Sequence, residues 1–64
     1  MMKVHVIDTT LDIVIKGYNN VVRIETDPDD MTCKISYIST DWEHTIKHDR
    51  IKVGPKDTNK VVIY

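Results

Sequence analysis

Residues 11–26 read LDIVIKGYNNVVRIET, and this stretch decides the fold. On each side of the central Gly-Tyr-Asn-Asn segment, apolar and polar side chains alternate, as expected for strands with one buried face. Glycine and asparagine tolerate the positive φ angles that tight turns need. The stretch therefore predicts a β-hairpin, with strands at 11–16 and 22–26 joined by a turn at 17–20.

The composition extends this prediction to the whole chain. Ile, Val and Thr make up 24 of the 64 residues, Leu occurs once and Ala is absent. Because β-branched side chains lose rotamer freedom in a helix and pack well on a sheet, these proportions favour strands. Further strands are predicted at 2–7, 33–37, 50–53 and 60–64, separated by polar loops at 8–10, 27–30 and 54–59.

The alternation breaks between the fourth and fifth of these runs. Trp42 to Lys47 fits either a strand or one helical turn. Ile46 has an even number and Ile51 an odd one, so a single regular strand would place their side chains on opposite faces of the sheet. We therefore expect a turn or bulge near residues 48–49, since one extra residue transfers the following side chains to the other face.

Five or six short strands in residues 1–64 predict a single all-β domain. A domain of this size buries only about 60% of the surface that its unfolded chain exposes, so its core is expected to be small. Closing the sheet would shield its edges, which favours an antiparallel barrel of SH3-like or OB-like type, with a small two-sheet sandwich as the alternative. If the strand at 60–64 lies at a sheet edge, we expect a homodimer through it.

No motif in the chain indicates catalysis, a metal site or a cofactor. On a strand, His44 and His48 would lie about 13 Å apart, at about 3.3 Å per residue, which is too far for one ion. The acidic cluster at 27–30 lacks the rest of a calcium loop, and residues 54–61 lack the second glycine and the hydroxyl of a phosphate loop. Cys33 falls on the apolar face and is expected to be a buried, inert thiol. We therefore predict that the protein is not an enzyme.

The single cysteine and the lack of a signal peptide or a long apolar segment predict a cytoplasmic protein that does not bind membranes. The net charge of −1 hides an asymmetry. Residues 1–43 carry four basic and eight acidic side chains (−4), whereas residues 44–64 carry five and two (+3). The basic C-terminal third predicts one alternative function, nucleic-acid binding through Lys47, Arg50, Lys52, Lys56 and Lys60.

By elimination, the sequence predicts a module that binds a protein partner of unknown identity. An exposed strand edge would supply main-chain hydrogen bonds, and exposed aromatic side chains would supply selectivity. We expect Trp42 and Tyr18 to serve as aromatic anchors, the latter at the hairpin tip, and Val62 and Tyr64 to contribute at the edge. The competing interpretation of Trp42 is a core position, which is the more frequent one for the only tryptophan of a small domain.

The residue usage bears on the source of the protein. A chain rich in Ile, Lys, Asp and Thr without Ala is typical of an AT-rich coding sequence, which favours a bacteriophage or another mobile element. Small proteins from such sources frequently inhibit a host protein, so an inhibitor is the expected kind of partner binder. A self-assembling structural protein is the remaining alternative.

Overall fold

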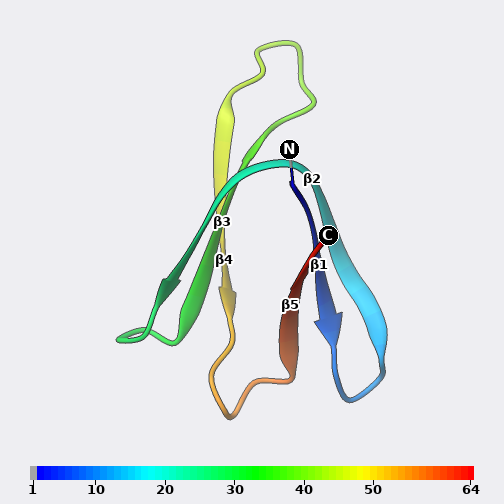
Figure 1. The fold of residues 1–64 in the computed structure, drawn as a ribbon, viewed down its shortest axis with the longest axis vertical. Helices are drawn as coiled ribbons and strands as arrows, with labels where there is room; N and C mark the ends of the chain where they lie inside the picture. Colours follow the sequence, from blue (N-terminus) through cyan, green and yellow to red (C-terminus); the bar gives the residue numbers. More distant parts are fainter. Residues whose placement is uncertain (1) are drawn as a thin grey trace.

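The chain folds into one curled antiparallel sheet, which a computed structural model describes for residues 2–64 (Figure 1). The strands are β1 (Met2–Asp8), β2 (Ile13–Asp27), β3 (Thr32–Ile38), β4 (Ile46–Lys52) and β5 (Asn59–Ile63). Their order across the sheet is β4-β3-β2-β1-β5, so the first four strands form a meander and the last pairs with the first. The all-β prediction is confirmed. Residues 2–64 hold no apolar helix of the length that a membrane crossing needs.

β2 is one bent strand at the place where the sequence predicted a hairpin. Residues 13–21 pair with β1, and residues 21–27 continue along β3. Of the predicted turn residues, Asn20 alone has a positive φ, at 58°, and Gly17 does not. A type I′ turn needs positive φ at both central residues, whereas one left-handed residue inserts a bulge that bends the strand. The hairpin prediction is therefore wrong, and the register of β1 against β2 shifts near the bend.

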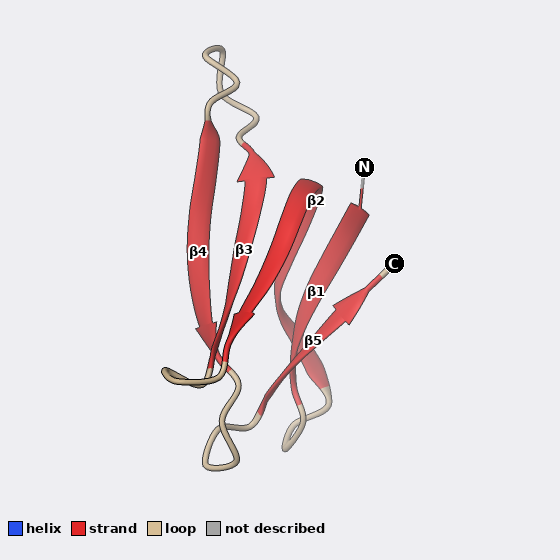
Figure 2. Ribbon diagram, turned by 60° about the vertical axis from the view of Figure 1, so that its left-hand side comes forward, coloured by secondary structure: helices blue, strands red, loops and turns tan. Residues whose placement is uncertain are grey.

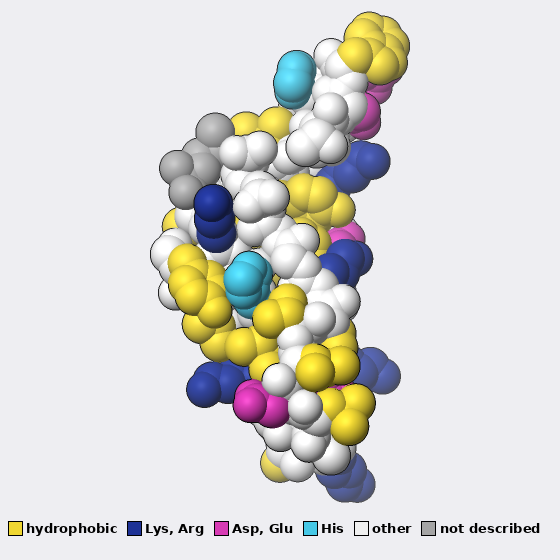
Figure 3. All heavy atoms as spheres, turned by 90° about the vertical axis from the view of Figure 1, so that its right-hand side faces the viewer, with side chains coloured by type: hydrophobic (Ala, Val, Ile, Leu, Met, Phe, Trp, Pro, Cys, Tyr) yellow, Lys and Arg dark blue, Asp and Glu magenta, His cyan; other side chains and the backbone are white. Residues whose placement is uncertain are grey.

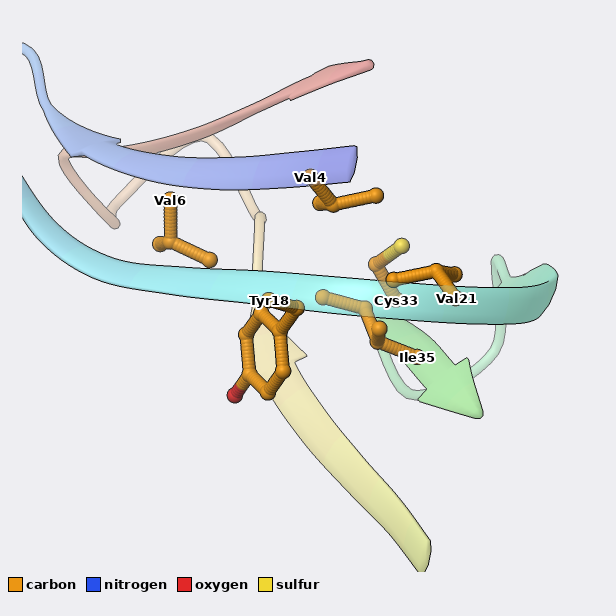
Figure 4. Packing of buried hydrophobic residues seen from close by; sticks show 6 residues of the cluster. All are labelled: Val4, Val6, Tyr18, Val21, Cys33 and Ile35. Atoms are coloured by element: carbon orange, nitrogen blue, oxygen red, sulfur yellow. The ribbon is translucent and has the colours of Figure 1, made fainter. Parts of the chain in front are cut away.

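The bend divides the sheet into two parts, called limbs below, which face each other across the concave side of the sheet. One limb contains β5, β1 and the first half of β2, and the other contains the second half of β2 with β3 and β4. Figure 4 shows the core between them, and it consists of Val4, Val6, Tyr18, Val21, Cys33 and Ile35. Cys33 is buried as predicted, and this burial raises the pKa of its thiol.

The sheet is open between β4 and β5, which stand apart in Figure 2. A hydrogen bond of 3.2 Å from the side-chain amide of Asn59 to the carbonyl of Lys52 joins the two strands at one end. The predicted closure into a barrel is therefore not observed. All five strands belong to one sheet, which also differs from the alternative prediction of a two-sheet sandwich.

β4 is a regular strand that begins later than the sequence indicated. Residues 42–43 form a turn within a loop, so the segment from Trp42 to Lys47 is neither a strand throughout nor a helical turn. β4 pairs with β3 without any register shift, and the turn or bulge predicted near residues 48–49 is wrong. Ile51 lies opposite Cys33 on the core side, whereas Ile46 is 56% exposed on the other face.

Many large hydrophobic side chains of residues 2–64 lie on the surface. They are Leu11, Ile13, Val14, Ile15, Val22, Met31, Trp42, Ile46, Ile63 and Tyr64. The accessible surface is 4696 Å², whereas a folded monomer of this mass is expected to expose about 4,200 Å². The chain on its own therefore exposes more surface than a compact monomer of its size, and large apolar side chains form part of that surface.

Truncation of Ile35 and Ile46 tests these two environments. Ile35 is fully buried, so Ile35→Ala should lower the free energy of unfolding by about 2–4 kcal/mol through lost burial and a cavity. Ile46→Ala should change it by less than about 1 kcal/mol, because this side chain faces solvent. Urea denaturation followed by circular dichroism measures both values. Equal losses for the two variants would contradict the outward position of Ile46.

Candidate functional site

A cleft of about 370 Å³ opens where the first half of β2 diverges from β3. Residues 16–19 of β2 form one wall, and the end of β3 with the start of the following loop, residues 37–41, forms the other. Lys47, near the start of β4, also lines the cleft. The cleft is thus a direct consequence of the bend in β2.

One edge of β2 is unpaired along this cleft. Residues 13–21 pair with β1, whereas β3 pairs only with residues 21–27. Within residues 2–64, the first half of β2 therefore has no neighbouring strand on its β3 side. The residue pattern does not reveal this edge, because a strand shared by two neighbours at a bend has the same pattern as a hairpin.

Gly17 places its backbone N–H and C=O on the open edge. The backbone N–H of Tyr64 donates a hydrogen bond of 2.8 Å to the carbonyl of Lys3. The backbone groups of the odd-numbered residues of β1 therefore point toward β5, and those of the even-numbered residues point toward β2. Tyr18 lies opposite Val4 and directs its backbone groups to β1. Backbone groups alternate along a strand, and Gly17 therefore faces the cleft. Glycine within a strand is typical of places where another backbone approaches closely.

A network of Lys16, Tyr18 and Asp49 joins the two limbs beside the cleft. The Tyr18 hydroxyl donates to Asp49 Oδ2 at 2.6 Å, and the Lys16 ammonium donates to the same oxygen at 2.9 Å. These donors hold the pKa of Asp49 below its usual range, while burial and the bond to Asp49 raise the pKa of Tyr18 to about 12. Tyr37 packs on Tyr18 with ring centroids 5.0 Å apart. At neutral pH the network holds a carboxylate between two protonated donors, and it braces the cleft.

The loop between β3 and β4 is organised by Asp41 and carries Trp42 at its tip. Ser39 donates to Asp41 Oδ1 at 2.6 Å, and the backbone N–H of His44 donates to the same oxygen at 3.0 Å. His44 has a φ of 49°, which closes the turn, and Lys47 lies 3.9 Å from Asp41. The hydrogen bond from Ser39 lowers the pKa of Asp41, so the loop is held by a carboxylate at neutral pH.

Trp42 is 86% exposed, so the interpretation as a core residue is wrong. Its loop projects at one end of the long axis in Figure 1, and Figure 3 shows a hydrophobic side chain standing at the tip of the molecule. The residues at the base of this loop line the cleft. Trp42 and the open edge of β2 therefore belong to neighbouring parts of one surface.

The other predicted anchors lie elsewhere. Tyr18, predicted at an exposed hairpin tip, is only 4% exposed, because β2 does not turn there and the ring faces the core. Val62 and Tyr64 are on the limb that contains β5, where the Tyr64 ring packs against His5 at a centroid distance of 4.5 Å. The structure does not bring them together with Trp42, whose loop lies beyond both chain ends in Figure 1.

The basic residues predicted to bind nucleic acid are also dispersed. Of the five, only Arg50 and Lys52 share the outer face of β4, and Lys47 lies on the opposite face of that strand, near Asp41. The remaining two lie in the loop before β5 and on β5 itself. Lys34 of β3 lies directly opposite Arg50 and was missed, because strand register cannot be derived from alternation alone.

Metal-ligating side chains do not cluster in residues 2–64: no three from His, Cys, Asp and Glu are close enough to hold an ion. His48 is instead hydrogen-bonded through Nδ1 to the hydroxyl of Ser36, at 2.7 Å. No family model matches the chain, and searches of curated proteins and of solved structures find no match. The cleft, its open edge and the Trp42 loop together form the candidate functional site.

Tyr18→Phe tests the network through its pH dependence. The variant leaves Asp49 with one donor fewer, so the pKa of this carboxyl should rise toward its ordinary value of about 3.9. A lowered native pKa contributes stability that is present above the unfolded-state pKa and is lost as the pH falls through the native pKa. The stability difference between wild type and Tyr18→Phe should therefore shrink between about pH 5 and pH 2.

Urea denaturation at a series of pH values measures this difference. Tyr37→Phe is the matched control, because the Tyr37 hydroxyl makes no hydrogen bond to Asp49 and its deletion should have a pH-independent effect. A pH-independent difference for Tyr18→Phe would contradict the role assigned to the Tyr18 hydroxyl.

Proposed function

We propose that the protein is a non-enzymatic β module that binds a protein partner by accepting an extended segment of that partner along the open edge of β2. The observation that carries this proposal is the unpaired edge at Gly17 in a cleft whose neighbouring loop presents an exposed Trp42. In this mode of recognition, main-chain hydrogen bonds supply affinity and side-chain pockets supply selectivity.

The open edge has the properties that strand addition requires. Gly17 offers both a donor and an acceptor, and the bend holds them apart from β3 without any rearrangement of the sheet. Tyr37 and Ile38 provide apolar surface on the opposite wall, and Lys16 and Asp41 provide polar groups at the rim. A partner segment with alternating apolar and polar side chains therefore matches the cleft.

Trp42 supplies the anchor beside this edge. Tryptophan buries about 150–250 Å² when it is fully covered and is enriched among the residues that dominate binding energy. The hydrogen bonds of Asp41 to Ser39 and His44 order the loop before binding. Ordering in advance lowers the entropy cost of association.

We also propose a barrel type for the fold and a biological source for the protein. A strand order of β4-β3-β2-β1-β5 with β2 shared between two limbs supports an incompletely closed barrel of SH3-like type. The residue usage supports a bacteriophage or mobile element as the source, and hence a cytoplasmic host protein as the inhibited partner.

A random peptide library displayed on phage, selected against the immobilised protein, tests the proposal. Selected peptides should shift the emission of Trp42, which is the only tryptophan, toward the blue as the indole leaves water. They should also slow hydrogen exchange at the Gly17 amide. Trp42→Ala should raise the Kd at least about 30-fold, as expected for a dominant contact.

Leu11→Ala is the matched control, because this exposed side chain lies in the turn between β1 and β2 and should leave the Kd unchanged. Peptides that bind without protecting the Gly17 amide, and equally well to Trp42→Ala, would place the site elsewhere and overturn the proposal.

A basic strip on the outer face of β3 and β4 favours nucleic-acid binding as a second candidate function. Lys34 and Arg50 lie directly opposite each other, with Lys52 two residues along β4. Like charges in such positions destabilise a sheet. Glu25, the acidic neighbour of Lys34 on β2, is held by Arg23 at 3.1 Å. Several phosphate groups of a nucleic acid would offset the like charges of the strip.

Salt dependence tests the second candidate. If three phosphates are contacted, the logarithm of the affinity for duplex DNA should fall with a slope of about −2.7 against the logarithm of salt concentration. Lys34→Glu should reduce this slope, and Lys3→Glu, on the other limb, should reduce it less. Fluorescence anisotropy with a labelled duplex measures both, and absence of binding at low salt would remove this candidate.

A further inference from the structure

β5 is an edge strand with little protection against further pairing. Its outer edge has no neighbouring strand within residues 2–64, and Figure 2 shows it apart from β4. Natural edge strands are usually protected by proline, bulges, inward charges or a covering segment. β5 contains no proline, and its one charged residue, Lys60, lies opposite Ile7 on the outer face. The bond from Asn59 to Lys52 covers only its first residue.

The free backbone groups of β5 follow from its pairing with β1. Tyr64 donates to the carbonyl of Lys3 at 2.8 Å, and the carbonyl of Thr58 accepts at 2.7 Å from the turn after β1. The even-numbered residues of this segment therefore face β1. Because backbone groups alternate between the edges of an antiparallel strand, Val61 and Ile63 direct their N–H and C=O groups to the free edge.

We infer that a second copy of this chain pairs with the free edge of β5, antiparallel and about a two-fold axis at Val62. In this register Val61 of each copy exchanges main-chain hydrogen bonds with Ile63 of the other. A closed two-fold arrangement is the commonest form of self-association, because one surface patch serves both copies.

The side chains along β5 favour this register over the registers with the two-fold axis one or two residues earlier. An axis at Lys60 would place the two Lys60 ammonium groups opposite each other, where like charges repel. An axis at Val61 would place Ile63 opposite Asn59, whose amide is already bound to Lys52. With the axis at Val62, the pairs Val62–Val62 and Val61–Ile63 are apolar. Each Lys60 lies opposite Tyr64 of the other copy, which permits a cation–π contact.

The side chains left exposed on β5 support a second copy as the occupant. Ile63 is 56% exposed on the core side of the sheet, and in the proposed register it covers Val61 of the other copy. Tyr64 is 65% exposed on the outer face and comes to lie beside Lys60. The pairing thus covers part of the 4696 Å² that the chain exposes, which exceeds the roughly 4,200 Å² of a compact monomer.

The inferred dimer goes beyond the proposed function. The Trp42 loop lies beyond the chain ends in Figure 1, away from β5, so each copy keeps its cleft and its aromatic anchor free. Two such sites on one sheet would bind two linked partner segments with an avidity above either single affinity.

Sedimentation equilibrium over a range of concentrations tests the inference on three chains. The wild type should be a dimer. Ile63→Pro removes a backbone N–H that β1 does not use, and proline is tolerated where the N–H faces away from the sheet, so the variant should fold. Because this N–H is a donor to the second copy, its loss should weaken dimerisation at least about tenfold. Ile63→Thr keeps the N–H and should remain a dimer. A monomeric wild type, or an Ile63→Pro variant that dimerises as well as Ile63→Thr, would overturn the inference.

Hydrogen exchange of the wild type provides a test that needs no variant. The amides of Val61 and Ile63 should become at least about tenfold more protected as the concentration rises, because only the dimer bonds them. The amides of Val62 and Tyr64 should be protected at every concentration, because they bond to β1. This measurement decides the matter if Ile63→Pro fails to fold, and a dimer with freely exchanging Val61 and Ile63 amides would contradict the proposed edge.

Discussion

The bend of β2 at Asn20 is the constraint on which the rest of the molecule depends. Asparagine is one of the few residues that adopt a positive φ at modest cost, and the value here is 58°. The resulting change of direction lets the two limbs face each other, which buries Val4 against the limb that carries Ile35. The same change separates the first half of β2 from β3 and leaves Gly17 without a neighbouring strand on its β3 side. One left-handed residue therefore produces both the core and the cleft.

Aspartates organise three of the loops that connect the strands. Asp8, Asp27 and Asp41 each accept backbone N–H groups from residues two or three positions later. Each of these turns also contains a residue of positive φ before the next strand, and these are Asp12, Met31 and His44. Three of the eight acidic side chains in residues 1–43 thus act as local turn acceptors.

The sequence predicted the parts of the fold that depend on local alternation. The strands at 2–7 and 33–37 and the loop at 27–30 are confirmed, because period-2 patterns and turn residues act locally. The hairpin at 11–26 was wrong, since a bend and a turn use the same residues and only the pairing partner distinguishes them. The exposure of Trp42 and the opposite faces of Ile46 and Ile51 depend on tertiary packing. The open edge of β2 is a property of the register between strands, which no single segment encodes.

The position of Cys33 between the limbs gives the molecule an internal reporter. Burial keeps this thiol protonated and out of contact with solvent. A thiol reagent needs the exposed thiolate, so it reacts only when the limbs part. The rate of thiol labelling at Cys33 therefore reports how often the sheet opens. A ligand that binds only the closed sheet should lower this labelling rate as the bound fraction of the protein increases.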